Sequence, residues 1–336
     1  MASIKKDVKE VLILDHGGHA LSFIPEQILR QYKVVGVEKT TRGLINLKAQ
    51  GFPPLPLIGV AHCAAKRILE SPLIAEAVIA KLLPLISIKD KNLVCGIVGY
   101  GAIGKAITAK LLSMQHKVIV YDNDPNQFRI AKDIRGMTVT NELSALVASA
   151  DYIFGCTGRD ITTSIDSFRL SSKNKTLISC SSEDIEFSSL IWLAAQQQRN
   201  GKAAINPLAD VEYHTDMGGT IRILKGGFPA NFDGSGESVP ANDIQLTRAL
   251  GLGGVLQAAR FFQRPDIVNS SGVYALDANM QKLIVNEWLK YQPSHRFPKD
   301  VIDQFQDVQW IEAHSGGTPE SGAVFLQPTP YRAVFV

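Results

Sequence analysis

Three glycines with a fixed spacing stand between an apolar run and an amphipathic segment. The stretch LVCGIVGYGAIGKAI places Gly99, Gly101 and Gly104 in a G-x-G-x-x-G pattern. In such a turn the first glycine permits a tight bend, the second lets the backbone approach a pyrophosphate, and the third lets helix and strand pack closely. The helix start adds free N–H groups and a positive dipole end. The pattern predicts a phosphate-binding turn, which also contains Ala102 and Ile103.

The next strand-like run supplies an acid. KVIVYDND ends near Asp122, about 20 residues beyond the turn, where a carboxylate binds the ribose diol of a dinucleotide. A carboxylate at this position also repels the ribose phosphate of NADP, so NAD is the favoured cofactor. The alternative is a bare βαβ unit with a glycine turn. Strand, helix and acid together favour a dinucleotide-binding domain.

A second candidate site lies in LILDHGGHA, residues 12–20. His16 and His19 flank a glycine pair directly after an apolar run, which predicts a loop at the carboxyl end of a strand, where ligands of α/β proteins bind. A neutral His16 is suited to act as a general base near pH 7. A half-exposed loop histidine without a role is the open alternative, and it is the favoured one for His19. With His62 nearby but no cysteine or carboxylate cluster, no metal site is predicted.

Apolar runs bounded by glycine alternate with helix-period segments along the chain. This alternation indicates βα units and a parallel sheet, and near-continuous apolar strands are typical of a sheet covered on both faces. The expected strands are 11–15, 34–37, 93–98, 118–122, 152–156 and 177–180, with helical stretches at 103–114 and 243–262.

Two composition shifts indicate domain boundaries. Pro84 and a charged run precede a fresh strand near 82–91, and residues 226–240 are rich in Gly, Pro and Ser. We therefore predict an α/β fold in which a doubly wound parallel-sheet (Rossmann) NAD domain is inserted into a smaller α/β substrate domain, followed by an extended C-terminal arm. The predicted ranges are 84–240 for the NAD domain, 1–83 plus 241–290 for the substrate domain, and 291–336 for the arm.

Composition argues against several classes of partner. The chain has 336 residues, 45% of them hydrophobic, which is enough for two domain cores. A net charge of +3 gives no case for nucleic acid or a membrane surface as partner. There is no bilayer-length apolar run, no secretory signal and no CxxC pair among the 4 cysteines. We expect a cytoplasmic protein with a small-molecule substrate.

Together with its neighbours, the turn resembles the S-adenosylhomocysteine hydrolase family. The similarity is carried by LILDHGG, VEKTTRG, GYGAIGK, YDNDP, CTG, VEYHTDMGGTIRILKGG and the tail PTPYRAVFV. In that family, bound NAD⁺ oxidises a ribose hydroxyl, homocysteine is eliminated, water adds and the ketone is reduced back. The resemblance implies a homo-oligomer, because the tail reaches a neighbouring subunit's NAD site. It also implies further cofactor contacts from Thr40, Thr41, Thr157, Gly158, Asn231 and Tyr331.

The chain departs from the family at its catalytic positions. His16 stands where the family has an aspartate, and Lys39 stands at the next catalytic acid. Lys66 and Glu70 match the family's lysine–aspartate pair. The family's glycine–histidine becomes Ser181 and Ser182, and its hinge histidine is missing. We also expect the family's long N-terminal segment to be absent, so the chain is predicted to be a shortened, catalytically divergent member.

Three functions follow as alternatives. The first is an NAD-dependent enzyme that oxidises a secondary alcohol other than S-adenosylhomocysteine, with or without elimination and re-reduction. His16 is its base, and Lys39 is a second base or the anchor of a substrate carboxylate. The second is adenosylhomocysteinase itself, and the third is a non-catalytic NAD-binding partner protein. Lys39 as a solvated lysine, and Lys66 with Glu70 as a surface helix pair, remain open.

Overall fold

The computed structural model describes residues 8–87, 90, 92–197, 206–232, 234, 238–293 and 296–306. The chain divides into two compact units, and unit 2 is inserted into unit 1. The described residues within Met1–Glu70 and Ala241–Pro328 form unit 1, and those within Ser71–Pro240 form unit 2.

The first boundary between the units differs from the predicted one. It follows Glu70 and not residue 83, because helix α4 (Ser71–Leu82) belongs to unit 2. Val78 and Leu82 of this helix lie in the core of unit 2. Pro84, which suggested the boundary, therefore follows a helix that is already part of unit 2.

Unit 2 is built on a seven-stranded sheet of order β6-β5-β4-β7-β8-β10-β9, in which only β9 is antiparallel to its neighbour. The strand order reverses at β4, because β5 and β6 extend the sheet on one side and β7 on the other. Ligands of doubly wound sheets bind at the carboxyl edge of such a reversal. The strands are β4 (Val94–Val98), β5 (Lys117–Tyr121), β6 (Thr138–Thr140), β7 (Tyr152–Gly155), β8 (Lys175–Ser179), β9 (Val211–His214) and β10 (Thr220–Ile223).

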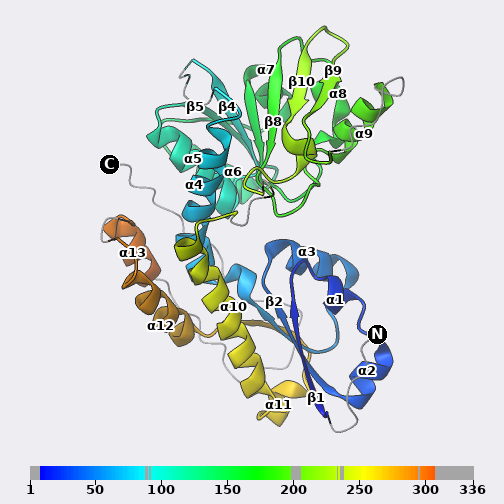
Figure 1. Ribbon diagram of the computed structural model, residues 1–336, viewed down its shortest axis with the longest axis vertical. Helices are drawn as coiled ribbons and strands as arrows, with labels where there is room; N and C mark the ends of the chain where they lie inside the picture. Colours follow the sequence, from blue (N-terminus) through cyan, green and yellow to red (C-terminus); the bar gives the residue numbers. More distant parts are fainter. Residues whose placement is uncertain are drawn as a thin grey trace. The chain divides into compact units, whose positions relative to one another are not determined.

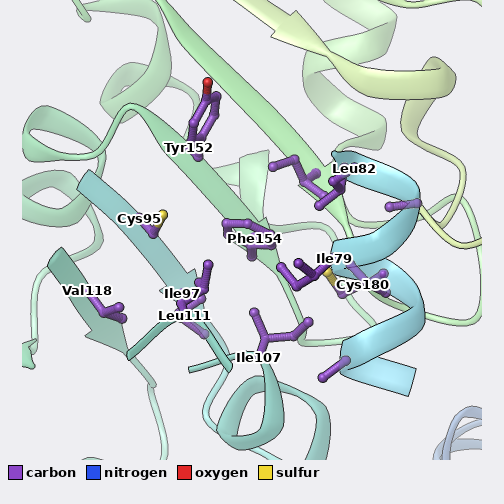
Figure 2. Packing of buried hydrophobic residues seen from close by; sticks show 14 of the residues in the cluster. Ile79, Leu82, Cys95, Ile97, Ile107, Leu111, Val118, Tyr152, Phe154 and Cys180 are labelled. Atoms are coloured by element: carbon purple, nitrogen blue, oxygen red, sulfur yellow. The ribbon is translucent and has the colours of Figure 1, made fainter. Parts of the chain in front are cut away.

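Helices cover both faces of this sheet (Figure 1). Figure 2 shows one apolar layer, in which Ile79, Ile107 and Leu111 from the helices pack against strand residues such as Phe154. The neighbouring residue Ile153 belongs to the layer on the opposite face. The central strands β4 and β7 therefore carry no charged residue. The first layer involves α4, α5 (Ala102–Ser113) and α6 (Pro125–Lys132), and the second involves α7 (Leu143–Ser149), α8 (Ile165–Arg169), α9 (Ser188–Gln197) and η3 (Ile161–Thr163).

Unit 1 is built on a four-stranded parallel sheet of order β1-β2-β3-β11. Leu21, Leu44 and Leu47 from helices α1 and α3 are part of the core on one face. Helix α10 packs on the other face (Figure 1). The elements are β1 (Glu10–Asp15), α1 (His19–Ser22), α2 (Glu26–Gln31), β2 (Lys33–Glu38), α3 (Thr41–Gln50), β3 (Pro56–Gly59), η1 (Val60–His62), η2 (Lys66–Glu70), α10 (Ala241–Phe261), α11 (Pro265–Val268), β11 (Gly272–Ala275), α12 (Ala278–Leu289) and α13 (Lys299–Gln306).

The predicted C-terminal arm is wrong in part. Helix α13 (Lys299–Gln306) lies within the predicted arm, belongs to unit 1 and buries Phe305. Pro298 directly precedes this helix, where a proline is tolerated. The rest of the predicted arm, with Tyr331, lies outside the described residues. No helix in the described part of the chain is long and apolar enough to span a bilayer.

A glycine sets the distance between α10 and the sheet of unit 1. A Cβ at Gly254 would stand 2.7 Å from Cγ2 of Val60 and 2.8 Å from Cγ1 of Val37. Glycine inside a helix costs about 1 kcal/mol relative to alanine. Close packing of the helix on two β-branched side chains is the contact that offsets this cost.

We expect Gly254→Ala to destabilise the protein by about 1–3 kcal/mol, because the added methyl overlaps two buried side chains. Denaturant unfolding followed by circular dichroism measures the change. Leu252→Ala on the exposed side of the same helix is the control and should alter the unfolding free energy much less. A stabilised Gly254→Ala variant would contradict this account of the packing.

Candidate functional site

The predicted glycine turn lies at the carboxyl end of β4, beside the strand-order reversal. Gly99 has a φ of 96°, and its N–H donates to the carbonyl of Tyr121 at 2.9 Å. A Cβ at Gly104 would stand 1.9 Å from the carbonyl oxygen of Gly99. Only glycine fits these two positions, one for its backbone conformation and the other for the close approach of helix to turn.

The middle glycine faces open space. A Cβ at Gly101 would meet nothing within 4 Å among the described residues. Gly101 is also the N-cap of α5, and no described side chain caps this helix start. The first N–H groups of α5, including those of Ala102 and Ile103, thus lie where a pyrophosphate is bound in dinucleotide-binding folds.

Asp122 follows β5, the strand next to β4, as the sequence predicted. Its Oδ2 accepts a hydrogen bond from the Tyr100 N–H at 2.5 Å, and its Oδ1 accepts from the Asp124 N–H at 2.8 Å. These bonds fix the carboxylate beside the glycine turn and leave each oxygen with acceptor capacity for a ribose hydroxyl. The open turn, the uncapped helix and this carboxylate together fit an adenine dinucleotide.

The strand beyond the reversal contributes a loop with a buried acid beneath it. The loop after β7 contains Thr157 and Gly158. Their N–H groups donate to Glu186 at 2.7 Å and 2.5 Å, and Glu186 is fully buried. The hydroxyls of Thr157 and Ser181 also donate to Glu186. The predicted cofactor contacts Thr157 and Gly158 therefore lie at the reversal, but their N–H groups point to the protein interior.

Asn231 lies at this same carboxyl edge of the unit 2 sheet. The N–H of its neighbour Ala230 donates to the carbonyl of Ser179, the last residue of β8, at 2.8 Å. The Asn231 side chain is buried and makes a long 3.4 Å contact to the carbonyl of Ser238. The structure therefore brings Asn231 to the edge that also holds Gly101, Asp122 and Thr157.

In unit 1, His16 follows β1 at the carboxyl edge of the sheet. Asp15 anchors the loop, because its carboxylate accepts from the N–H groups of His16 at 2.7 Å and Leu21 at 2.8 Å. Gly17 and Gly18 then have φ values of 93° and 75°, a conformation that favours glycine. The His16 side chain is only partly exposed.

Glu38, the last residue of β2, fixes this loop by hydrogen bonds. It is fully buried and accepts from the N–H groups of Gly17 at 3.2 Å and Gly18 at 2.9 Å. It also accepts from the Thr40 hydroxyl at 2.6 Å, while that hydroxyl accepts from Gly17 and Gly43. The Thr40 hydroxyl thus binds the loop and also caps the start of α3. Thr41, the other threonine predicted to contact the cofactor, begins α3 and is exposed.

The predicted lysine–acid pair forms at the neighbouring edge position, after β3. Lys66 Nζ lies 3.1 Å from Glu70 Oε2, and both side chains are mostly buried, at 17% and 13% exposure. Lys66 also donates to the carbonyl of Lys39 at 3.3 Å. The pair lies in a π-helix, an element often found at functional sites, and not on a surface α-helix face.

Lys39 is the cation of this cluster that keeps its ammonium available. Its stem packs against Gly251, where an added Cβ would stand 3.3 Å from Lys39 Cδ. Among the described residues its Nζ has no hydrogen-bond or ion-pair partner. His16, Lys39 and Lys66 therefore gather at one edge of the unit 1 sheet.

The surroundings favour the neutral form of His16. Partial burial lowers the pKa of its imidazole, and the Lys39 ammonium lowers that pKa further. Lys66 acts in the same direction, while Glu38 and Asp15 oppose the shift. A neutral imidazole beside a cation is able to accept a proton from a hydroxyl at neutral pH. In the described part of the chain, no three His, Cys, Asp or Glu side chains converge on a metal-sized site.

Sequence reasoning missed the two buried acids, Glu38 and Glu186. One signal for Glu38 was its place directly after the apolar run VVGV, although acids are seldom fully buried. Glu186 has no such signal, because it follows the polar run SSED and reaches the β7 loop only through the tertiary fold.

Comparisons with known proteins identify the central part of unit 2. The family model of the D-isomer specific 2-hydroxyacid dehydrogenase NAD binding domain matches residues 81–173. This span contains the glycine turn, Asp122 and the β7 loop. Unit 2 therefore contains an NAD-binding domain of dehydrogenase type, and NAD(H) is the cofactor it takes.

Longer similarities reach curated proteins. An uncharacterized protein of Mycobacterium tuberculosis is 30% identical over 254 residues, which are 74% of this chain and 46% of that protein. The adenosylhomocysteinase of Sulfolobus acidocaldarius is 26% identical over 170 residues, 46% of this chain and 40% of that enzyme. The chain thus spans less than half the length of these relatives.

Among solved structures, a 2-hydroxyacid dehydrogenase from Ketogulonicigenium vulgare is 13% identical with a TM-score of 0.44. The similarity covers 76% of this chain and 82% of that one.

We expect Asp122→Ala to weaken NAD binding by about tenfold or more, because the ribose loses a charged hydrogen-bond acceptor. Affinity for NADP should fall less or rise, since the repulsive carboxylate is gone. Isothermal titration calorimetry measures both. Asp124→Ala removes only the N-cap of α6 and is the control. Unchanged NAD affinity in Asp122→Ala would contradict the assignment.

We expect the pKa of His16 to lie below that of an ordinary histidine and to rise in Lys39→Met, which keeps the packing of the stem on Gly251 but removes the charge. Proton-detected NMR titration of the histidine ring signals, assigned with a His16→Gln variant, measures the shift. A Lys39→Met titration identical to wild type would show that the two groups are not coupled.

Proposed function

We propose that the protein is an NAD-dependent enzyme that oxidises a secondary alcohol of a small anionic substrate other than S-adenosylhomocysteine. One observation carries the proposal. His16, with its pKa lowered, and Lys39, whose ammonium has no partner in the described part of the chain, gather at the carboxyl edge of a sheet. The same chain contains an NAD-binding domain.

The proposed chemistry assigns one task to each residue. His16 accepts the proton of the substrate hydroxyl, since its neutral imidazole is the available base. Bound NAD supplies the hydride acceptor for the carbinol carbon. Lys39 pairs with a substrate carboxylate or stabilises negative charge on the oxygen as the proton leaves. Lys66 and Glu70 hold the backbone of Lys39 in place through the Lys66 bond to its carbonyl.

The parent activity is the second candidate, because adenosylhomocysteinases are among the relatives. Two features weigh against it. His16 and Lys39 stand at positions where that family has acids, and Ser181, which stands in place of part of its glycine–histidine, donates its hydroxyl to the buried Glu186. Homo-oligomerisation with shared NAD sites, through the tail that carries Tyr331, also belongs to this proposal.

The test is the near-ultraviolet spectrum of the NAD-loaded protein during a screen of secondary alcohols that includes 2-hydroxy acids and S-adenosylhomocysteine. We expect the band of reduced nicotinamide to appear with an anionic alcohol and not with S-adenosylhomocysteine. A band only with S-adenosylhomocysteine would support the parent activity. No band with any alcohol would support an NAD-binding protein without turnover.

Substitutions then test the assigned roles. His16→Ala should lower the rate of nicotinamide reduction by about 10²–10⁴, the usual worth of a general base, while NAD affinity stays unchanged. Lys39→Ala should raise KM for an anionic alcohol. His19→Ala, in the same loop and also exposed, is the matched control. Full activity in His16→Ala and Lys39→Ala would overturn the roles given to these residues.

A further inference from the structure

Glu186 is a buried charge whose partners are all neutral. It is fully buried, and among the described residues it has no ion-pair partner; its carboxylate is held only by hydrogen-bond donors. These donors are the N–H groups of Thr157 and Gly158 and the hydroxyls of Thr157 and Ser181. A buried carboxylate without a cation is expensive to keep, so its retention calls for a reason.

The position of Glu186 supplies that reason. Its donors come from the segments that follow β7 and β8, at the carboxyl edge beyond the strand-order reversal. The same β7 segment adjoins the glycine turn, since a Cβ at Gly99 would stand 2.8 Å from Thr157 Cγ2 and 2.9 Å from the backbone of Cys156. The conformation of this loop therefore decides the shape of one wall of the NAD turn.

We propose that Glu186 is a positioning residue, whose ionised carboxylate holds the loop of residues 156–158 in the conformation that binds NAD, so that NAD affinity depends on the ionisation of Glu186. This inference rests on NAD binding at the glycine turn. It does not depend on the chemistry proposed for His16 and Lys39, which are in the other unit.

The hydrogen-bond pattern explains why protonation matters. The ionised carboxylate is an acceptor only, and it faces four donors. Protonation removes the charge that strengthens the bonds from the N–H groups of Thr157 and Gly158 to Oε1. It also turns one oxygen into a donor, so that a hydroxyl has to reorient; the Thr157 hydroxyl has the Arg159 carbonyl at 3.0 Å as another acceptor. The loop is then held less tightly, and so is the wall beside Gly99.

The direction of the pH dependence follows from the surroundings. Burial raises the pKa of Glu186 above that of an ordinary glutamate, although the bonds from Ser181, Gly158 and Thr157 oppose the shift. The folded protein therefore binds this proton more tightly than the unfolded chain does. The resulting contribution of Glu186 to folding stability is present at low pH and is lost as pH rises through the raised pKa. At neutral pH the ionised group therefore lowers folding stability while it orders the loop.

The other titratable and charged groups near Glu186 are few. The hydrogen bond with Cys180, together with burial, raises the pKa of the partly exposed Cys156 thiol well above its usual value, so this thiol stays protonated. Arg159 and Asp160 lie on the β7 segment, and Glu183 and Asp184 lie on the segment of Glu186 itself. Asp160 is held by its own donors, Thr162 and Ser189.

The first test measures the Kd for NAD of the wild-type protein from neutral to mildly acidic pH by calorimetry. We expect the Kd to rise as pH falls through the raised pKa of Glu186, at a higher pH than an ordinary glutamate would titrate. In Glu186→Gln the Kd should be about tenfold higher at neutral pH and nearly independent of pH in this range. Asp160→Asn, which alters a carboxylate with an equal number of donors, is the control and should keep the wild-type profile.

Ser181→Ala gives a second test that does not need the Glu186 variant to fold. It removes a donor that favours the ionised carboxylate, so the inflection of the Kd profile should move to higher pH. A purely structural role would change the melting temperature of these variants without moving that inflection. A wild-type Kd that is flat with pH, or Ser181→Ala and Glu186→Gln profiles like wild type, would overturn the proposal. If NAD binding were lost in Asp122→Ala but unchanged in Glu186→Gln, the assignment of the cofactor site would stand. Only the role of Glu186 would be rejected.

Discussion

A carboxylate buried without a cation has to be satisfied by hydrogen-bond donors, and the structure uses this constraint at one loop in each unit. In unit 1, Glu38 gathers the N–H groups of Gly17 and Gly18; in unit 2, Glu186 gathers those of Thr157 and Gly158. Each loop follows a parallel strand at the carboxyl edge of its sheet. The acids fix loops that have no regular hydrogen-bonding pattern of their own.

This arrangement determines what each loop offers to a ligand. Because the N–H groups point to the buried acids, the opposite sides of the loops carry the groups that remain available. In unit 1 that group is the His16 imidazole, with Lys39 beside it. In unit 2 the N–H groups of Thr157 and Gly158 are taken by Glu186, and the available N–H groups are those of a different segment, the uncapped start of α5 after β4. The first edge is thus suited to acid–base chemistry and the second to binding phosphate.

The two family signals in the chain refer to different parts of it. The dehydrogenase NAD-binding model covers 81–173, and this span explains the cofactor. The similarity to adenosylhomocysteinases is low and covers less than half of the chain. A Rossmann domain serves many reactions, so the chemistry has to be argued from the unit 1 cluster of His16, Lys39 and Lys66.

The sequence by itself determined the features that depend on local spacing. Glycines at 99, 101 and 104, the acid at 122 and the apolar runs of β1, β2, β4, β5, β7 and β8 are readable because a turn and the strand after it are encoded by neighbouring residues. Only the tertiary structure decided the rest. β11 joins the sheet by pairing with β3, more than 200 residues earlier, and α4 belongs to unit 2 through its core contacts. The roles of three further features likewise depend on contacts that strand register and packing create: Glu38, Glu186 and the Lys66–Glu70 π-helix. No local sequence pattern specifies these contacts.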